Sequence, residues 1–199
     1  MINLKNRLPL IIIQLIFLSL VTTAQTKTNL ELIYSVLDSS INDISQNFNP
    51  EDNIGFKYSS APGLEFLENR ISLKFNSKFN LNKGSADSLL NYNLDNVAVK
   101  YNEMFRSGIF GDYLVEREAN VMGSYILVNK EEIINSDIFT FADIDTVNLD
   151  EIENLENSTI PFTQSKIPPE PFFSSLLEPV IAIGAAAVTV FLFFNVRSK

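Results

Sequence analysis

At residues 90–101, LNYNLDNVAVKY, the spacing of apolar residues changes from the three- and four-residue steps found upstream, which are typical of helices, to alternation. Apolar and polar residues alternate from Leu90 to Leu94 and again from Val97 to Tyr101. A period of two is typical of a β-strand with one buried face. The phase shifts across Asp95–Asn96, which predicts a bulge or a turn at this pair.

Further strands are predicted downstream of this segment. A glycine-containing connection at 107–112 leads into an alternating stretch from Tyr113 to Val128. A turn near Asn129–Lys130 then precedes a last strand through 138–144. Consecutive alternating segments separated by short turns predict an antiparallel meander.

Two amphipathic helices are predicted upstream, with a short strand at 54–58 between them. From Thr28 to Phe48 the apolar residues recur at steps of three and four, which places them on one helical stripe. Thr28 and Glu31 have the spacing of a capping box, and Asn49–Pro50 stops this helix. The second helix places three apolar residues on one face: Leu64, Leu67 and Ile71.

Together these segments predict an α+β domain at residues 25–145. Two amphipathic helices pack on one face of a mainly antiparallel sheet, in the order helix, strand, helix and three strands. Both helices and all strands lie within a length typical of one domain.

The N-terminus has the organisation of a secretory signal peptide at residues 1–24. Lys5 and Arg7 precede an apolar run from Leu8 to Leu20, which is followed by small and polar residues ending at Ala24. The run is shorter than the roughly 20 residues that span a bilayer, so cleavage before Gln25 is expected. An uncleaved signal anchor is the alternative.

The C-terminus predicts one membrane helix at 176–196. Residues 180–194 are uncharged and apolar, Pro179 precedes them, and a helix of this length rises about 30 Å. Arg197 and Lys199 follow the apolar run, so the positive-inside rule places the tail at 197–199 in the cytoplasm. We therefore expect a single-pass bacterial membrane protein with its domain on the extracytoplasmic side.

The segment at 146–175 turns acidic and then proline-rich. Such a composition favours an extended stalk between the domain and the membrane. Leu149, Ile152, Leu155 and Phe162 offer apolar side chains with which part of the stalk can dock on the domain.

Composition excludes several classes of function. The net charge of −9 disfavours a nucleic-acid partner, because phosphate binding depends on an excess of Lys and Arg. The chain has neither Cys nor His, which excludes disulfides, a lipid-modified cysteine anchor, zinc sites of His or Cys, and triads with a His base. We accordingly predict no catalytic residue, no metal site and no cofactor.

Carboxylates are densest near the end of the predicted domain. A calcium loop would alternate its ligands around a glycine, and this stretch has no glycine, so a solvated acidic face is favoured. The group comprises Asp143, Asp145, Asp150, Glu151, Glu153 and Glu156.

Arg117 is predicted on the buried face of its strand, alongside Val115 and Ala119. A buried arginine needs a partner, because an unpaired charge in the core is costly. The alternatives are a structural ion pair, a side chain whose stem lies along the sheet towards water, or a ligand-binding arginine. Glu116 and Glu118 flank it but point to the other face.

Four aromatic residues surround the connection at 107–112: Tyr101, Phe105, Phe110 and Tyr113. Core packing is the default for such residues. An exposed aromatic patch that contacts a partner protein is the alternative.

The tail from Leu192 to Lys199, LFFNVRSK, resembles the C-terminus of bacterial envelope proteins that have no assigned function. The triplet Pro169–Glu170–Pro171 ahead of an apolar run is similar to exosortase-type sorting tails, although the distance to the helix and the single Arg and Lys differ from that pattern. The order of helices and strands is loosely similar to small modules of the curli-secretion and flagellar outer-membrane families. No motif transfers a residue role.

The favoured hypothesis is a non-enzymatic envelope protein whose anchored domain binds another envelope protein in a secretion, assembly or sensing complex. The alternatives are an envelope enzyme that uses carboxylates or arginine, and a small-ligand-binding ectodomain. The sequence does not determine the oligomeric state.

Overall fold

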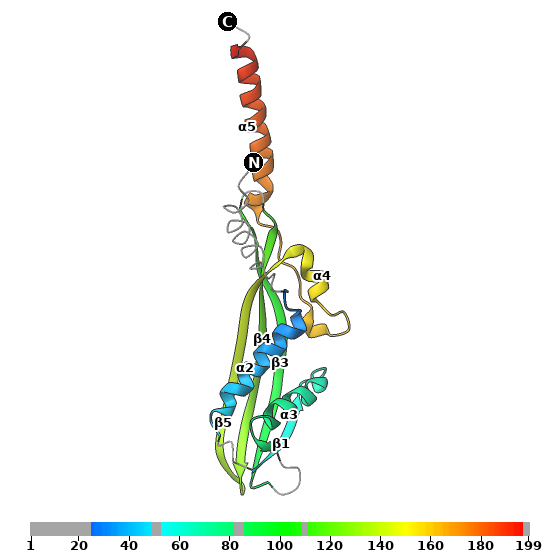
Figure 1. The fold of residues 1–199 in the computed structure, drawn as a ribbon, viewed down its shortest axis with the longest axis vertical. Coiled ribbons are helices and arrows are strands. Elements are labelled where there is room, and N and C mark those ends of the chain that lie inside the picture. The colour runs from blue at the N-terminus through cyan, green and yellow to red at the C-terminus, as the bar shows by residue number, and fades with distance from the viewer. Residues whose placement is uncertain (1–24, 49–52, 82–85, 109–110, 197–199) are drawn as a thin grey trace, which may run out of the picture.

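The computed structural model describes residues 25–48, 53–81, 86–108 and 111–196. Figure 1 shows one elongated sheet with helices on one face and a long helix extending from one end. In chain order the elements are α2 (Asn29–Ser45), β1 (Asn53–Ser60), η2 (Glu65–Leu67), α3 (Glu68–Asn76), β2 (Asn80–Leu81), β3 (Ser88–Arg106), β4 (Tyr113–Asn129), β5 (Glu132–Asn148), η3 (Leu149–Glu151), α4 (Ile152–Leu155), η4 (Pro161–Thr163) and α5 (Phe172–Val196).

The sheet has the strand order β2-β1-β3-β4-β5. The three long strands β3, β4 and β5 form an antiparallel meander, as predicted. β1 instead runs parallel to β3, and the crossover between them carries α3. The α+β class is confirmed, with a mixed sheet whose longest pairs are antiparallel.

The predicted irregularity in β3 is a bulge. The register with β4 shifts between Leu94 and Asn96, where Leu94 lies opposite Gly123. A Cβ on Gly123 would lie 2.6 Å from Cζ of Phe139 and would also overlap the carbonyl oxygen of Asn93. The close approach of these strands therefore requires glycine at position 123.

The capping box at the start of α2 is confirmed. The backbone amide of Thr28 donates to Oε2 of Glu31 at 2.8 Å, and the amide of Glu31 donates to Oγ1 of Thr28 at 3.2 Å. These bonds with Thr28 lower the pKa of the Glu31 carboxyl. α2 ends at Ser45, and its predicted stop at 49–50 lies outside the described residues.

The core lies between the helices and one face of the sheet. Aromatic rings fill its centre: Tyr92 is 5.5 Å from Phe75 and 5.3 Å from Phe139, measured between ring centroids. α2 packs over β4 and β5, while α3 packs beside β1. This packing covers one face of the sheet (Figure 1).

The predicted boundary between domain and stalk at 145/146 falls inside β5. β5 continues to Asn148, and Val147 is buried opposite Val115 of β4. Ile152 and Leu155 of α4 are also buried in the core. Apolar residues three positions apart within an acidic segment dock on the sheet, so the domain extends to about η4.

The predicted helix at 176–196 lies within α5, which begins earlier, at Phe172. Pro179 therefore lies inside the helix and not in its first turn. Within the described part of the chain, no helix has the length and hydropathy required of a membrane span. The predicted signal peptide at 1–24 and tail at 197–199 lie outside the described residues.

Candidate functional site

Arg117 is fully buried on the helix-covered face of β4. Asp145 lies directly opposite on β5 and forms a bidentate ion pair with it. Nε of Arg117 donates to Oδ1 of Asp145 at 2.8 Å, and a terminal nitrogen donates to Oδ2 at 2.6 Å. The structural ion pair, one of the alternatives considered for Arg117, is present.

The second terminal nitrogen of Arg117 binds the chain that leads into α2. It donates to the carbonyl oxygen of Lys27 at 2.8 Å and to Oδ1 of Asn29 at 2.7 Å. Asn29 is itself fully buried, and its Nδ2 donates to the hydroxyl of Tyr101 at 2.8 Å and to the carbonyl oxygen of Thr163 at 2.7 Å. We call these residues, with Asp145, the Arg117 network.

The Arg117 network joins four parts of the chain: the entry to α2, the paired strands β4 and β5, strand β3 and η4. Every nitrogen of the guanidinium donates to a protein oxygen. Burial raises the pKa of Tyr101 to about 12, so its hydroxyl stays protonated at neutral pH. This arrangement stabilises the fold and leaves no exposed face of the guanidinium for a ligand.

Asn29 was not identified as a functional or structural residue from the sequence. Its only sequence signal is a polar residue directly after the capping threonine of an amphipathic helix, where a polar side chain is ordinary. The partner Asp145 belonged to the predicted acidic group, but its strand pairing with Arg117 could not be read from spacing.

The predicted acidic group is dispersed. Asp145 pairs with Arg117, Glu151 accepts a hydrogen bond from Thr26 at 3.1 Å, and Glu156 accepts one from the amide of Ser165 at 3.1 Å. Asp143 is exposed on β5. Among the described residues, no three carboxylates gather into a group that could hold a metal ion.

The four predicted aromatic residues do not form one exposed patch. Tyr101 is buried in the core, whereas Phe105 is exposed on the opposite face of the sheet. The ring of Tyr113 lies 4.7 Å from the guanidinium carbon of Arg106, and its hydroxyl is 3.4 Å from Glu170. Phe110 lies outside the described residues.

A different surface stands out: the face of β3, β4 and β5 that no described helix covers, which we call the open face. Strand register places on it side chains that alternate with the buried ones. Ile138 and Ile144 of β5 are 76% and 57% exposed. Other large exposed apolar residues of the open face are Leu89, Phe105, Met122, Ile126 and Ile133, which pairs with Val128.

β5 is also the edge strand of the sheet. It pairs with β4 on one side, and no other described strand pairs with its outer side. The amide of Ile138 donates to Oδ1 of Asp137 at 2.8 Å. The sequence predicted a strand here but not the exposure of its isoleucines. A signal was present: Ile138 and Ile144 fall on one face of the strand and Phe139 and Phe141 on the other, so both faces carry apolar side chains.

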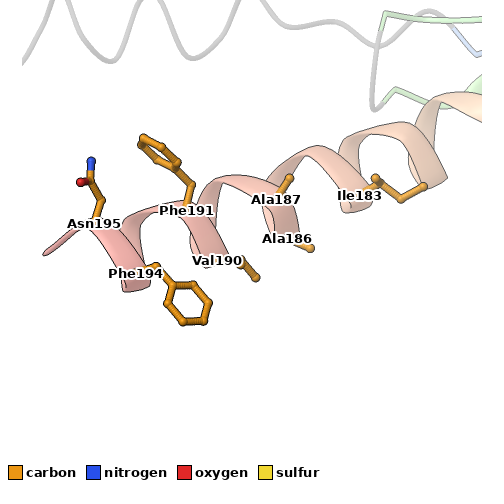
Figure 2. Close-up of a pocket in the computed structure, with 7 residues that line it drawn as sticks. All are labelled: Ile183, Ala186, Ala187, Val190, Phe191, Phe194 and Asn195. Atoms are coloured by element: carbon orange, nitrogen blue, oxygen red, sulfur yellow. The ribbon is translucent and has the colours of Figure 1, made fainter. Parts of the chain in front are cut away.

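The exposed surface of α5 is apolar along the length for which side chains are described. Figure 2 shows a shallow hollow on this helix, with Ile183 towards its base and Phe191 and Phe194 towards its end. Small residues, Ala186 and Ala187, lie between them. The only polar side chain lining the hollow is Asn195, so the surface offers apolar packing rather than chemistry.

Comparisons with known proteins are sparse. No family model and no curated protein matches this chain. Among solved structures, it is similar to the rare lipoprotein B from Shewanella oneidensis, with a TM-score of 0.26 and 9% sequence identity, over 72% of this chain and 93% of that chain. A similarity at this level carries no argument about the function of this chain.

Proposed function

We propose that this chain is a membrane-anchored, non-enzymatic protein of the bacterial envelope whose α+β domain binds another envelope protein. The open face carries this proposal. It presents large apolar side chains from three adjacent strands, whereas soluble monomers rarely expose extended apolar patches without a partner.

The buried side of the domain supports a binding role over a catalytic one. The one fully buried charged side chain among the described residues, Arg117, is held by Asp145 and Asn29. Its hydrogen bonds are internal, so Arg117 is occupied and does not serve the arginine-based versions of the enzyme and ligand-binding alternatives.

The proposed anchor is the apolar run at 180–194, and its support is the sequence rather than the helix α5 of the structure. The apolar run from 180 to 194 and the basic residues at 197 and 199 suit a helix whose C-terminal end faces the cytoplasm. The sheet would then stand on the extracytoplasmic side, with α5 at the end nearest the membrane (Figure 1).

Topology is tested with single-cysteine variants, because the natural chain has no cysteine. A membrane-impermeant maleimide added to spheroplasts should label Leu73→Cys on α3, away from the open face, and leave Ser198→Cys unlabelled until the membrane is permeabilised. Labelling of both positions, or of Ser198→Cys alone, would contradict the proposed topology.

Partner binding is tested by photo-crosslinking in native membranes. A benzoyl-phenylalanine placed at Met122 or Ile144 of the open face should form a discrete adduct. The matched control is Leu73, which is 71% exposed on α3 and lies on the helical side of the domain. Adducts of equal yield from all three positions, or none from the open face, would overturn the proposal.

A further inference from the structure

We infer that the free edge of β5 receives an extended segment of the partner protein, in which apolar and basic side chains alternate. This inference rests on the proposed function and names the kind of partner segment that the sheet takes. The segment would add a sixth strand beside β5, so that its backbone groups pair with those of the edge.

The backbone of β5 is suited to strand addition. The strand runs for 17 residues, Glu132–Asn148, a length of about 55 Å at roughly 3.3 Å per residue. Natural edge strands are normally protected by charged side chains, lysine above all, by proline, by bulges or by a covering element. β5 contains neither lysine nor proline, its charged residues are all acidic, and its register shift against β4 lies near its start; no described strand pairs with its outer side.

The side chains on the open face define the apolar half of the partner segment. Ile138 and Ile144 lie on this side of β5, with Thr140 and Ala142 between them, and all four are exposed. Side chains of an added strand lie beside those of its neighbour on the same face. Alternate residues of the partner would therefore be apolar, and their burial would remove the exposed isoleucines from water.

Charge on the other side of β5 defines the second half of the pattern. Asp137 and Asp143 are exposed on the face shared with α2, and β5 has no basic residue. Asp137 lies directly opposite Tyr125 of β4, and burial and then the charge of Asp137 raise the pKa of the Tyr125 hydroxyl. Basic residues at the intervening positions of the partner would lie beside these carboxylates.

A second copy of this chain fits the edge less well. If two β5 strands paired antiparallel with Ile138 opposite Ile144, Asp137 of one copy would face Asp145 of the other. If Thr140 faced itself, Asp137 would face Asp143. Like charges directly opposite each other are destabilising in a sheet, and each chain carries a net charge of −9.

The test uses the full-length protein in detergent micelles and two labelled nine-residue peptides. One alternates isoleucine with lysine, and the other alternates isoleucine with glutamate. Both are N-methylated along one edge so that they cannot stack on themselves. Fluorescence anisotropy should show at least tenfold tighter binding of the lysine peptide at low salt, with the difference shrinking as salt is added.

Two pairs of variants locate the binding. Ile138→Lys with Ile144→Lys should weaken binding at least tenfold, whereas the same added charge on β3, Asn91→Lys with Asn96→Lys, should have a much smaller effect.

Asp137→Asn with Asp143→Asn should reduce the preference for the lysine peptide without changing the core. Asp150→Asn with Glu153→Gln is its control, because both carboxylates are exposed and lie away from the edge.

Equal affinity for the two peptides, or full binding by the Ile138→Lys, Ile144→Lys variant, overturns the inference. The natural protein could instead be a dimer that binds neither peptide and that the Ile138→Lys, Ile144→Lys variant converts to a monomer. This result would reject the inference and assign the edge to a second copy of the chain. Crosslinks from Met122 without peptide binding would leave the proposed function standing and reject only strand addition. If neither crosslinks from Met122 nor peptide binding is found, the proposed function is rejected as well.

Discussion

Arg117 on β4 and Asp145 on β5 face each other across the strand pair and exchange two hydrogen bonds at 2.8 and 2.6 Å. Arg117 is fully buried, while the Asp145 side chain keeps 35% of its exposure. The pair also ties the sheet to the start of α2, since Arg117 donates to the carbonyl oxygen of Lys27 and to the amide oxygen of Asn29.

Replacing Arg117 should therefore destabilise the domain strongly. Arg117→Met removes the guanidinium and leaves Asp145 and Asn29 without their donor, and we expect a loss of about 3 kcal/mol in the free energy of unfolding. Urea unfolding measures it. The control is Arg70→Met, whose pair with Asp38 is partly exposed, with an expected loss below about 1 kcal/mol. Equal losses in the two variants would contradict a structural role for the Arg117 network.

Tyr92 should make stability fall in alkaline solution. Burial raises its pKa well above the usual value of about 10. Above pH 10 the unfolded chain loses a proton that the folded chain keeps, so the free energy of unfolding decreases as the pH rises towards the folded pKa. Tyr101, with a pKa of about 12, acts in the same direction.

The variant Tyr92→Phe separates these contributions. It should show a shallower decline between pH 10 and 11 than the natural chain. Among the described residues, the only hydrogen-bonding interaction of the buried Tyr92 hydroxyl is a weak one with the Ser40 side chain, so at pH 8 the variant should change stability by less than about 1 kcal/mol. Urea titrations at pH 8, 10 and 11 measure both effects. An unchanged alkaline slope would refute the prediction.

Gly123 should tolerate no side chain. An added Cβ would overlap the ring of Phe139 and the backbone of β3, so Gly123→Ala should cost about 2 kcal/mol. Ser124→Ala, one residue further on the open face, should change stability by less than about 0.5 kcal/mol. Thermal unfolding of both variants is sufficient, and a neutral Gly123→Ala would mean that the strands can separate at the bulge.

Ile152 should behave as a core residue and not as part of a stalk. It is buried in α4, so Ile152→Ala should reduce stability by about 3 kcal/mol. Ile167→Ala, at a 40% exposed position beyond η4, should cost less than about 1 kcal/mol. Similar small losses at both positions would restore the predicted boundary at 145/146.

Local patterns predicted most of the elements. The capping box at Thr28 and Glu31 defined the start of α2, because its two bonds depend only on residues three apart. The phase shift at Asp95–Asn96 located the bulge for a similar reason. The burial of Arg117 followed from alternation with Val115 and Ala119, and so did its need for a partner.

Properties that depend on long-range pairing could not be predicted. The parallel alignment of β1 with β3, the choice of Asp145 as the partner of Arg117 and the role of Asn29 require knowledge of which strands lie side by side. The exposure of Ile138 and Ile144 depends on β5 being an edge strand. The sequence offered Ile152 as a residue that can dock on the domain, but its full burial depends on which elements lie beside α4.

Solvent protection of the open face in the native membrane tests the central claim most directly. Thr140→Cys on the open face and Leu73→Cys on α3 would each be labelled with a maleimide, in osmotically opened cells and as purified full-length protein. We expect labelling of Thr140→Cys to be at least tenfold slower in membranes than in purified protein, with no change at Leu73→Cys. Equal labelling rates of Thr140→Cys in the two preparations would show that nothing covers the open face and would overturn the proposed function.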